Sequence, residues 1–457
     1  MVMKILLIAS NIASTPYPVY PLGLSMLAAA LRNGGHKVSQ FDFLQNNKSM
    51  DALCNAIGES TPDIIGVSIR NIDNVNLLNE QRYINVVKDI VQTIRTQTSV
   101  PVVLGGAAFS IMPETILREV GADYGIVGEG ETLMLKFVAD AEKGKYPKER
   151  CIRTASKLSG KEIPSAYYDP DIMNFYLKMG NIGSIQTKRG CTHKCVYCSY
   201  PVLEGASIRC RDPQTVVDDI QMLIDTHKAK YIFFTDSVFN DDQEHYLDVV
   251  QEMAKRGIST PWTAFFKPEK MDDEIIALMK QTGLKAAELG SDASTDTTLR
   301  RLGKSFLFKD IIECNDTFVR SGIATAHYYM FGCPGETRKT VLEGIENIIN
   351  LKKTVSFIFM GIRILPGTGL EKIAQKQGIL SSGQDLLEPV YYISPNIDKK
   401  WLEETLTKAF SGIRHCIFPP DVMDTSLQFL HKLGYSGSMW DMLLSGNRNK
   451  RKKPREI

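Results

Sequence analysis

The sequence lacks an apolar run long enough to span a bilayer, because its longest apolar runs are short or broken by charged residues. A signal peptide is not expected either, since the apolar run at residues 4–9 has only the size of a β-strand. An excess of one charge is also missing, because the net charge is only +2 at pH 7. Bulk electrostatics therefore favours neither nucleic acid nor a membrane surface as a partner.

A disulfide framework is absent as well. The nine cysteines are odd in number and three of them lie close together, unlike the paired cysteines of small secreted domains. We therefore expect a cytoplasmic protein in a reducing environment. The 457 residues are enough for two or three domains, and 43% apolar and 23% charged content is ordinary for a globular chain.

Three cysteines, Cys191, Cys195 and Cys198, form a C-x₃-C-x₂-C pattern. Thiolates are soft ligands that suit iron–sulfur clusters and zinc, and both kinds of site normally take four protein ligands. Here the count is three, because Cys210 is too far along the chain and too near an expected helix start. A 4Fe–4S cluster held by three thiolates would leave one iron open to a small molecule. The alternatives are a zinc knuckle that includes His193, or three unrelated thiols.

The stretch at residues 186–201 resembles the signature of radical S-adenosylmethionine (SAM) enzymes. The resemblance implies that Cys191, Cys195 and Cys198 hold a 4Fe–4S cluster whose open iron binds SAM. It also implies that the cluster passes one electron to SAM, which releases a 5′-deoxyadenosyl radical.

Residues 1–145 alternate between strand-like and helical patterns. This alternation predicts an α/β domain with a doubly wound, Rossmann-like parallel sheet. Ligands of such sheets bind beyond the carboxyl ends of the strands. The expected strands lie at residues 4–9, 37–43, 63–69, 102–104 and 123–127, with helices between them, for example at residues 22–35, 81–96 and 132–142.

Three of these strands end in unusual loops: Ser68-Ile-Arg-Asn-Ile-Asp-Asn74, Gly105-Gly-Ala-Ala-Phe-Ser110 and Gly128-Glu-Gly-Glu131. Paired glycines let a backbone approach a ligand closely. Together with residues 20–31 and 123–131, the loops resemble the cobalamin-binding domain of cobalamin-dependent radical SAM enzymes. The resemblance implies cobalamin contacts from Ser68, Arg70, Asn71, Gly105, Gly106, Ala107, Phe109, Ser110, Gly128, Glu129 and Gly130.

The loop after the first expected strand, residues 10–21, contains no histidine. Other cobalamin domains place a cobalt-ligating histidine there. His36, the only histidine of the first domain, follows a helix and is expected at the surface. The resemblance therefore implies cobalamin bound without a protein imidazole.

Residues 146–180 are polar and are expected to form an irregular linker. Residues 181–380 contain six strand–helix units, which predict the partial (β/α)₆ barrel that the family resemblance also implies. Barrel chemistry takes place at the loops after the strands, and carboxylates there suit the ribose hydroxyls of SAM. The resemblance implies SAM contacts from Tyr197, Asp236, Lys267, Glu288 and Asp292.

Residues 381–457 are expected to form a small, mostly helical segment that covers the barrel mouth, with helices at residues 401–413 and 422–433. The basic tail at residues 448–455 is expected to be a solvated terminus.

The family resemblance implies a cobalamin-dependent radical SAM enzyme that methylates an unactivated carbon. We expect a small-molecule, lipid-precursor or natural-product substrate and an electron donor such as flavodoxin or ferredoxin. A first alternative keeps both cofactors but cyclises or rearranges the substrate, and a second is a non-catalytic cobalamin or iron–sulfur protein. A methylthiotransferase is disfavoured, because Cys54 is the only cysteine of the first domain where those enzymes place a second triad.

Overall fold

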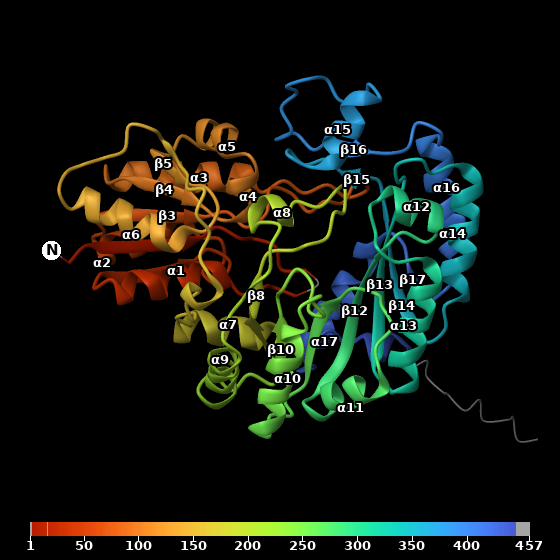
Figure 1. Ribbon diagram of the computed structural model, residues 1–457. Helices are drawn as coiled ribbons and strands as arrows, with labels where there is room; N and C mark the ends of the chain where they lie inside the picture. Colours follow the sequence, from red (N-terminus) through yellow and green to blue (C-terminus); the bar gives the residue numbers. More distant parts are fainter. Residues whose placement is uncertain (1, 16, 445–457) are drawn as a thin grey trace, which may run out of the picture.

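The computed structural model of the protein describes residues 2–15 and 17–444 and contains two parallel α/β units (Figure 1). The N-terminal unit lies on the left of that view and the second unit on the right. The basic tail at residues 448–455 lies outside the described residues. Within residues 2–15 and 17–444, no helix has both the length and the apolar character needed to cross a membrane.

The first sheet has the strand order β2-β1-β3-β4-β5-β6, and all of its pairs are parallel. Its central strands are almost entirely apolar and buried, as expected of strands that are covered on both faces. The chain order reverses direction between β1 and β3, which makes the carboxyl ends of those strands the expected ligand site. The strands are β1 (Lys4–Ala9), β2 (Lys37–Asp42), β3 (Ile64–Ser68), β4 (Val102–Gly105), β5 (Tyr124–Ile126) and β6 (Cys151–Ile152).

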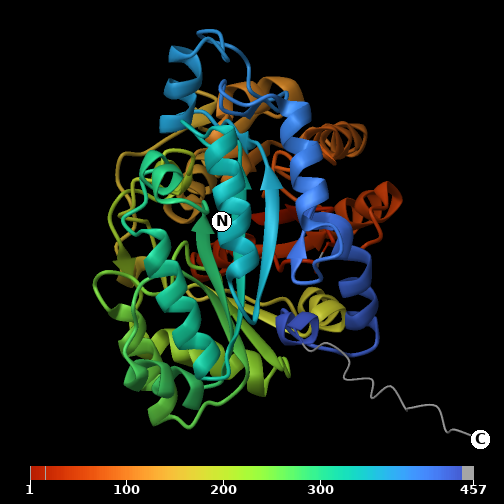
Figure 2. The same ribbon diagram turned by 90° about the vertical axis from the view of Figure 1, so that its right-hand side faces the viewer.

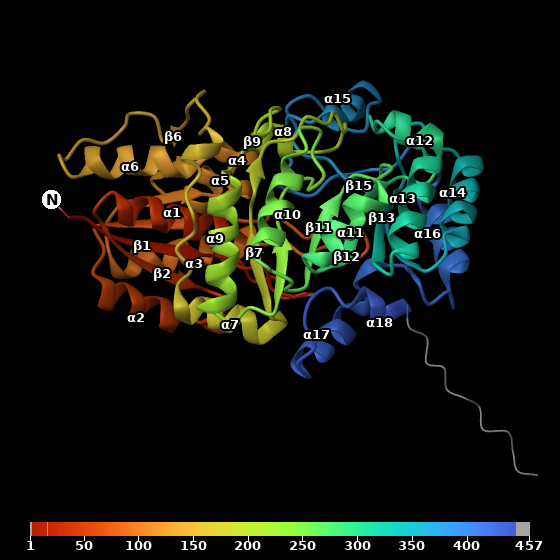
Figure 3. The same cartoon turned by 60° about the horizontal axis from the view of Figure 1, so that its bottom comes forward.

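Helices cover both faces of this sheet, which confirms the predicted doubly wound arrangement (Figure 3). One face packs against α1 (Leu22–Asn33) and α6 (Gly130–Ala141). The other face packs against α2 (Met50–Ser60), α3 (Ile84–Gln97) and α5 (Pro113–Val120). The short helix α4 (Ala107–Ile111) follows β4 directly.

The linker expected at residues 146–180 is not irregular throughout. It contributes β6 to the edge of the first sheet, a 3₁₀ turn η1 (Gly160–Glu162) and the helix α7 (Pro170–Gly180). Asp169 caps α7 by accepting the backbone N–H groups of Asp171 and Ile172, and Pro170 occupies its first turn. The polar composition of the segment hid this short capped helix, whose buried face includes Met173 and Tyr176.

The second sheet has the order β17-β14-β13-β12-β11-β10-β7, again with all pairs parallel. Six of its strands follow the predicted strand–helix units and form a partial barrel. The seventh, β17 (Cys416–Ile417), comes from the C-terminal segment. The six are β7 (Ile182–Ile185), β10 (Tyr231–Phe234), β11 (Trp262–Phe266), β12 (Leu284–Asp292), β13 (Ala324–Phe331) and β14 (Thr354–Met360).

The helices of the second unit separate consecutive strands, as expected of a barrel built from strand–helix units. Two short antiparallel strand pairs lie beside its main sheet, β8 (Lys188–Arg189) with β9 (Arg209–Cys210) and β15 (Ile362–Arg363) with β16 (Tyr391–Tyr392). The helices are α8 (Tyr200–Leu203), α9 (Pro213–Asp225), α10 (His245–Lys255), α11 (Asp273–Gln281), α12 (Asp296–Arg301), α13 (Phe308–Arg320), α14 (Arg338–Asn350) and α15 (Gly369–Lys376).

The end of the C-terminal segment packs against the inside of the partial barrel, whereas its first helix packs with Phe331 and Ile358 on the other face of the sheet. Val355 and Phe357 of β14 form one apolar cluster with Leu427 and Trp440 of this segment. Figure 2 shows the segment, in blue, beside the yellow helix α7, which α17 contacts. The segment was expected to be mostly helical, and the structure adds one strand, β17, to its helices. Its elements are α16 (Lys399–Phe410), β17, a 3₁₀ turn η2 (Pro420–Met423), α17 (Asp424–Lys432) and α18 (Trp440–Leu444).

A buried ion pair fastens the first domain to the barrel. Arg363 of β15 donates to Asp73, in the loop after β3, with an Nε–Oδ2 distance of 2.8 Å, and both side chains are 2% exposed. The remaining guanidinium nitrogens of Arg363 donate to the carbonyls of Ile364 and Leu386. All of this guanidinium's nitrogens therefore have acceptors, as a buried charge requires.

We expect Arg363→Met to destabilise the protein by about 3–5 kcal/mol, because the carboxylate of Asp73 would stay buried without its partner. Urea unfolding of the two proteins measures the difference. The control is Arg82→Met, which removes a pair with Glu388 from the same two regions. Arg82 is 45% exposed, so solvent screens its pair and its loss should change stability far less than the loss of Arg363. Equal effects of the two substitutions would contradict the assignment of Arg363 as the fastening residue.

Candidate active site

A single cavity of about 1280 Å³ lies between the two units. It is lined by the carboxyl ends of strands in the first sheet, by inner-face residues of the barrel and by the C-terminal segment. Ordinary small-molecule pockets measure about 300–1,000 Å³. The cavity is therefore large enough for an unusually bulky ligand, or for more than one.

Most residues predicted to bind cobalamin line this cavity. Phe109 is the exception: it is fully buried and lies under Gly125, where an added Cβ would be 2.0 Å from its ring. The turn of α4 directs Phe109 into the core, and this part of the prediction is wrong. The predicted residues that line the cavity are Ser68, Arg70, Asn71, Gly105, Gly106, Ala107, Ser110, Gly128, Glu129 and Gly130.

The glycine loops are held against each other closely. Gly106 has a φ of +95°, and a Cβ there would lie 2.5 Å from the carbonyl oxygen of Ile69. Ser110 donates to the carbonyl of Gly106 at 2.8 Å and accepts from the backbone N–H of Gly128 at 2.8 Å. The loops after β3, β4 and β5 therefore form one continuous cradle in which Gly106 has no room for a side chain.

No histidine lines the cavity; all seven histidines of the chain fall within the described residues. This agrees with a cobalamin site that has no protein imidazole. The Arg70 side chain is exposed to the cavity, and none of the ion pairs between described residues includes it. Its effect on the pKa of Tyr17 shows that the guanidinium lies near that ring.

The Gly128–Glu131 loop also joins the two units. Arg189 of β8 lies 2.6 Å from Glu131 and 3.5 Å from Glu129, and Arg209 of β9 lies 2.6 Å from Glu129. Burial raises the pKa of Glu129, but Arg209 and the backbone N–H of Leu158 outweigh it, so that the pKa is lowered. Glu129 therefore holds the antiparallel pair β8–β9 against the first domain, in addition to lining the cavity.

The cysteine loop lies in the segment that connects β8 to β9. Cys191, Cys195 and Cys198 are free thiols, and the loop is fixed at Val196, which donates to the carbonyl of Leu302 at 2.9 Å and accepts from the N–H of Leu370 at 2.7 Å. Among the described residues, no three His, Cys, Asp or Glu side chains converge on one metal ion. A cubane cluster binds each thiolate at a separate iron, so three spaced, unpaired thiols on one fixed loop fit such a cluster.

A lysine that sequence reasoning missed lies beside these thiols. Lys304 forms an ion pair with Asp292 and lies 3.4 Å from the hydroxyl of Tyr197, which donates to Asp292 at 2.5 Å. Burial raises the pKa of Cys195, whereas the ammonium of Lys304 lowers it. Asp292 has a φ of +61° at an irregularity of β12, a strained conformation of the kind found at functional sites. Tyr197 and Asp292 are thus brought to the cysteine loop as predicted for SAM.

Comparison with known proteins agrees with both halves of this site. The B12 binding domain family matches residues 9–138, and the radical SAM superfamily matches residues 185–361. The chain is a cobalamin-binding radical SAM enzyme. Its cofactors are accordingly a 4Fe–4S cluster, SAM and cobalamin, and the residues of this structure fit the cluster and the corrinoid as described above.

Individual relatives of this radical SAM enzyme cover most of its length. Tryptophan 2-C-methyltransferase of Streptomyces laurentii is 24% identical over 438 residues, covering 79% of this chain and 73% of the relative. Anaerobic magnesium-protoporphyrin IX monomethyl ester cyclase of Rubrivivax gelatinosus is 24% identical over 346 residues, covering 71% of this chain and 60% of the relative. The structure of the radical SAM methyltransferase TsrM from Kitasatospora setae, with cobalamin and a 4Fe–4S cluster bound, has the same fold, with a TM-score of 0.85, 23% identity and coverage of 97% and 98%.

Two further residues predicted to bind SAM lie beside the cysteine loop but already have partners within the protein. Asp236 is buried, accepts from the N–H and hydroxyl of Thr187 at 2.8 and 2.6 Å, and pairs with Lys188. It therefore fixes the turn that enters the cysteine loop. Lys267 is paired with Asp242 at 2.7 Å and Glu269 at 2.8 Å, so its ammonium is already matched by two carboxylates. Neither lines the cavity.

Glu288 is the third departure from the SAM prediction. It lies four residues before Asp292 on β12, which corresponds to roughly 13 Å along an extended strand. It lines the cavity rather than the cysteine loop, and Tyr328 donates to its Oε2 at 2.7 Å. Burial raises its pKa from 4.5 to about 7, although Tyr328 and Trp440 lower it in part. The geometry therefore does not support a contact of Glu288 and Asp292 with the same ribose.

The raised pKa of Glu288 predicts how stability depends on pH. The unfolded chain releases this proton near pH 4.5, whereas the folded protein keeps it to about pH 7, so stability falls as pH rises between these values. We expect Glu288→Gln to gain roughly 3 kcal/mol relative to wild type between about pH 5 and about pH 8. Urea unfolding at both pH values measures this. Buried Glu336 also has a pKa of about 7, but it contributes the same pH dependence to the stability of both proteins and so cancels in the difference. A difference in unfolding free energy between the two proteins that does not change with pH would contradict the raised pKa of Glu288.

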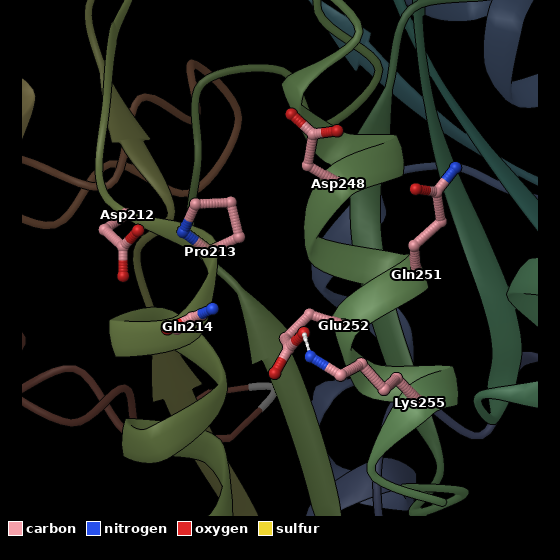
Figure 4. A pocket seen from close by; sticks show the side chains of 7 residues that line it. All are labelled: Asp212, Pro213, Gln214, Asp248, Gln251, Glu252 and Lys255. Atoms are coloured by element: carbon pink, nitrogen blue, oxygen red, sulfur yellow. Dashed lines mark hydrogen bonds and ion pairs between the residues drawn. The ribbon is translucent and has the colours of Figure 1, made fainter.

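A second hollow of about 310 Å³ lies outside the barrel between α9 and α10 (Figure 4). Three of its polar side chains have partners within the protein: Glu252 pairs with Lys255 at 3.2 Å, and Asp212 accepts from the N–H of Thr215 at 2.9 Å. None of its lining residues belongs to the cavity or to the cysteine loop. The interdomain cavity is therefore the candidate active site.

Proposed function

We propose that this enzyme transfers a methyl group to a carbon atom of a small-molecule substrate. When bound, the 4Fe–4S cluster supplies the electron that cleaves SAM, and cobalamin carries the methyl group. One observation supports the proposal most strongly: the cradle of the first domain and the inner face of the barrel open into the same cavity. Reactants held in one enclosed space meet the demand for proximity without diffusion between sites.

The chain's own residues have distinct parts in this proposal. The three cysteines hold the cluster, and Ser199 and Tyr200, which follow Cys198 directly, line the cavity and so connect the cluster loop to it. Asp292 and Tyr197 offer hydrogen-bonding groups to SAM, and Lys304 keeps a positive charge beside Cys195.

The relatives support a carbon as the methyl acceptor, because one of them is named tryptophan 2-C-methyltransferase. The substrate is proposed to be a small molecule, with lipid precursors and natural products as the classes to test first. An electron donor such as flavodoxin or ferredoxin would supply the reducing electron. The reducing cytoplasm suits the nine free cysteines of the described chain.

A cyclisation reaction with the same cofactors is the second candidate, since one relative is named a cyclase. The two reactions differ in what happens to the methyl group. Methylation adds one methylene to the product and uses two molecules of SAM, whereas cyclisation adds none.

The test is anaerobic reconstitution with iron, sulfide and cobalamin, followed by incubation with reductant, a small-molecule extract and SAM that has a deuterated methyl group. Mass spectrometry should find a product that gains the deuterated methyl group, absent with the Cys195→Ala variant. A product without label but with altered hydrogen content would favour the cyclase. Zinc in place of iron and sulfide in the purified protein would refute the proposal altogether.

A further inference from the structure

Glu288 differs from the other carboxylates that line the cavity. Its side chain is 2% exposed, Tyr328 is its only hydrogen-bond donor, and its Oε1 accepts no hydrogen bond from the described residues. Among the other lining carboxylates, Asp73 pairs with Arg363, and Glu129 and Glu131 pair with Arg189. Glu204 accepts from the N–H of Gly190, and both oxygens of Asp421 accept from Asn76 and Asn79.

Trp440 of α18 is the nearest further donor to Glu288. Its indole N–H lies close enough to lower the pKa of the carboxyl, yet neither this N–H nor Oε1 of Glu288 makes a hydrogen bond of acceptable geometry. The groups that act on Glu288 are therefore a hydroxyl and an indole, and neither is charged. A buried carboxylate of this kind lacks the partner that normally offsets its desolvation.

Aromatic rings surround this carboxylate. Tyr328 stacks on Phe357 with centroids 5.4 Å apart and lies 6.1 Å from Phe265, and Phe357 lies 5.1 Å from Trp440. All four rings line the cavity. Aromatic faces attract cations electrostatically, and more strongly where water is excluded.

Within residues 2–15 and 17–444, no paired cation is found for Glu288. The cavity is lined by two positively charged side chains, Arg70 and Arg189. Arg189 is paired with Glu131 and Glu129, and neither arginine is among the groups that lower the pKa of Glu288. A ligand that carries a positive charge would therefore complement this part of the cavity.

We propose that Glu288 and the rings of Phe265, Tyr328, Phe357 and Trp440 form a subsite for a positively charged nitrogen group of the substrate, such as a primary ammonium. This inference rests on the proposed function, since it names the substrate class of the same cavity. The ammonium would donate a charge-assisted hydrogen bond to Oε1 and contact the aromatic faces. Glu288 thereby becomes a binding residue for substrate rather than for SAM.

Binding of simple probes to the reconstituted holoenzyme, with SAM but without reductant, tests this inference. The probes are 2-phenylethylamine, 2-phenylethanol and phenylacetate, which share a ring and differ in charge, and equilibrium dialysis measures their dissociation constants. We expect the amine to bind at least ~10-fold more tightly than the alcohol, and the anion to bind most weakly.

Three variants locate the effect. Glu288→Gln should abolish the preference for the amine, and Tyr328→Phe should keep it because the carboxylate remains. Glu313→Gln makes the same chemical change at an exposed position of α13 and should leave the preference intact. An equal affinity for amine and alcohol in wild type, or an unchanged preference in Glu288→Gln, would overturn the inference. Binding is measured without turnover, so a failure of methyl transfer would not affect the measured preference for the amine. In the same way, a missing preference for the amine would not decide whether the enzyme transfers a methyl group.

Discussion

Cys195→Ala is expected to abolish the production of 5′-deoxyadenosine while cobalamin stays bound. Removing one thiolate leaves two ligands for the cluster, which cannot hold it in place with an open iron. Loss of an outer hydrogen-bonding partner at a metal site typically costs about 10–100-fold, so loss of a ligand should exceed about 100-fold. Chromatography of reaction mixtures measures 5′-deoxyadenosine, and absorbance spectra measure the corrinoid.

The separation of the two effects follows from the fold. Cys195 lies on the loop after the first barrel strand, whereas the glycine cradle belongs to the first domain, which has its own sheet and a separate apolar core on one face of that sheet. The matched control is Cys54→Ala, which removes a free thiol of the first domain. Retained 5′-deoxyadenosine formation in the Cys195 variant would refute the ligand assignment.

Gly106→Ala is expected to have the opposite outcome, with the corrinoid lost and the cluster kept. The new Cβ would lie 2.5 Å from the carbonyl oxygen and 2.9 Å from the amide nitrogen of Ile69, and φ at this position is +95°. Backbone atoms cannot move aside as a flexible side chain can, so the loops after β3 and β4 must separate. The strain alone is worth about 1–3 kcal/mol. We expect bound cobalamin to fall at least ~10-fold, with iron and sulfide content unchanged.

Gly58→Ala provides the control for this substitution. Gly58 lies in α2 of the same domain and has open space where a Cβ would be added. Alanine there should leave corrinoid binding unchanged and stabilise the helix by about 0.5–1 kcal/mol. Normal cobalamin content in Gly106→Ala would show that the cradle does not bind the corrinoid.

Much of the site was predictable because its signals are local in the sequence. The spacing of Cys191, Cys195 and Cys198 requires only that one loop folds on itself. The paired glycines at Gly105 and Gly106 mark a backbone that comes close to other groups, and the structure places them at the cavity. Each of these features can be recognised without knowledge of distant contacts.

The predicted site residues that do not line the cavity are those whose environment depends on distant parts of the chain. The resemblance of the loop at residues 105–110 to cobalamin-binding domains implied a contact from Phe109, but one helical turn directs its side chain into the core. Asp236 follows a strand end as a ligand-binding carboxylate would, yet Thr187 and Lys188 occupy its oxygens. Lys304 was overlooked because nothing in its sequence neighbourhood relates it to Cys195 or Asp292.

By itself, the sequence determined most strands and helices of the two main units, the position of the cysteine loop and the glycine-rich strand ends, because hydrophobic periodicity and residue spacing are properties of short segments. Only the tertiary structure decided which carboxylates are neutralised and which remain without a cation. That distinction separates Asp73, which has Arg363 as its partner, from Glu288, which has none. The physical reason is that charges interact through space, so the partner of a buried carboxylate is set by how the domains pack and not by its neighbours in the chain.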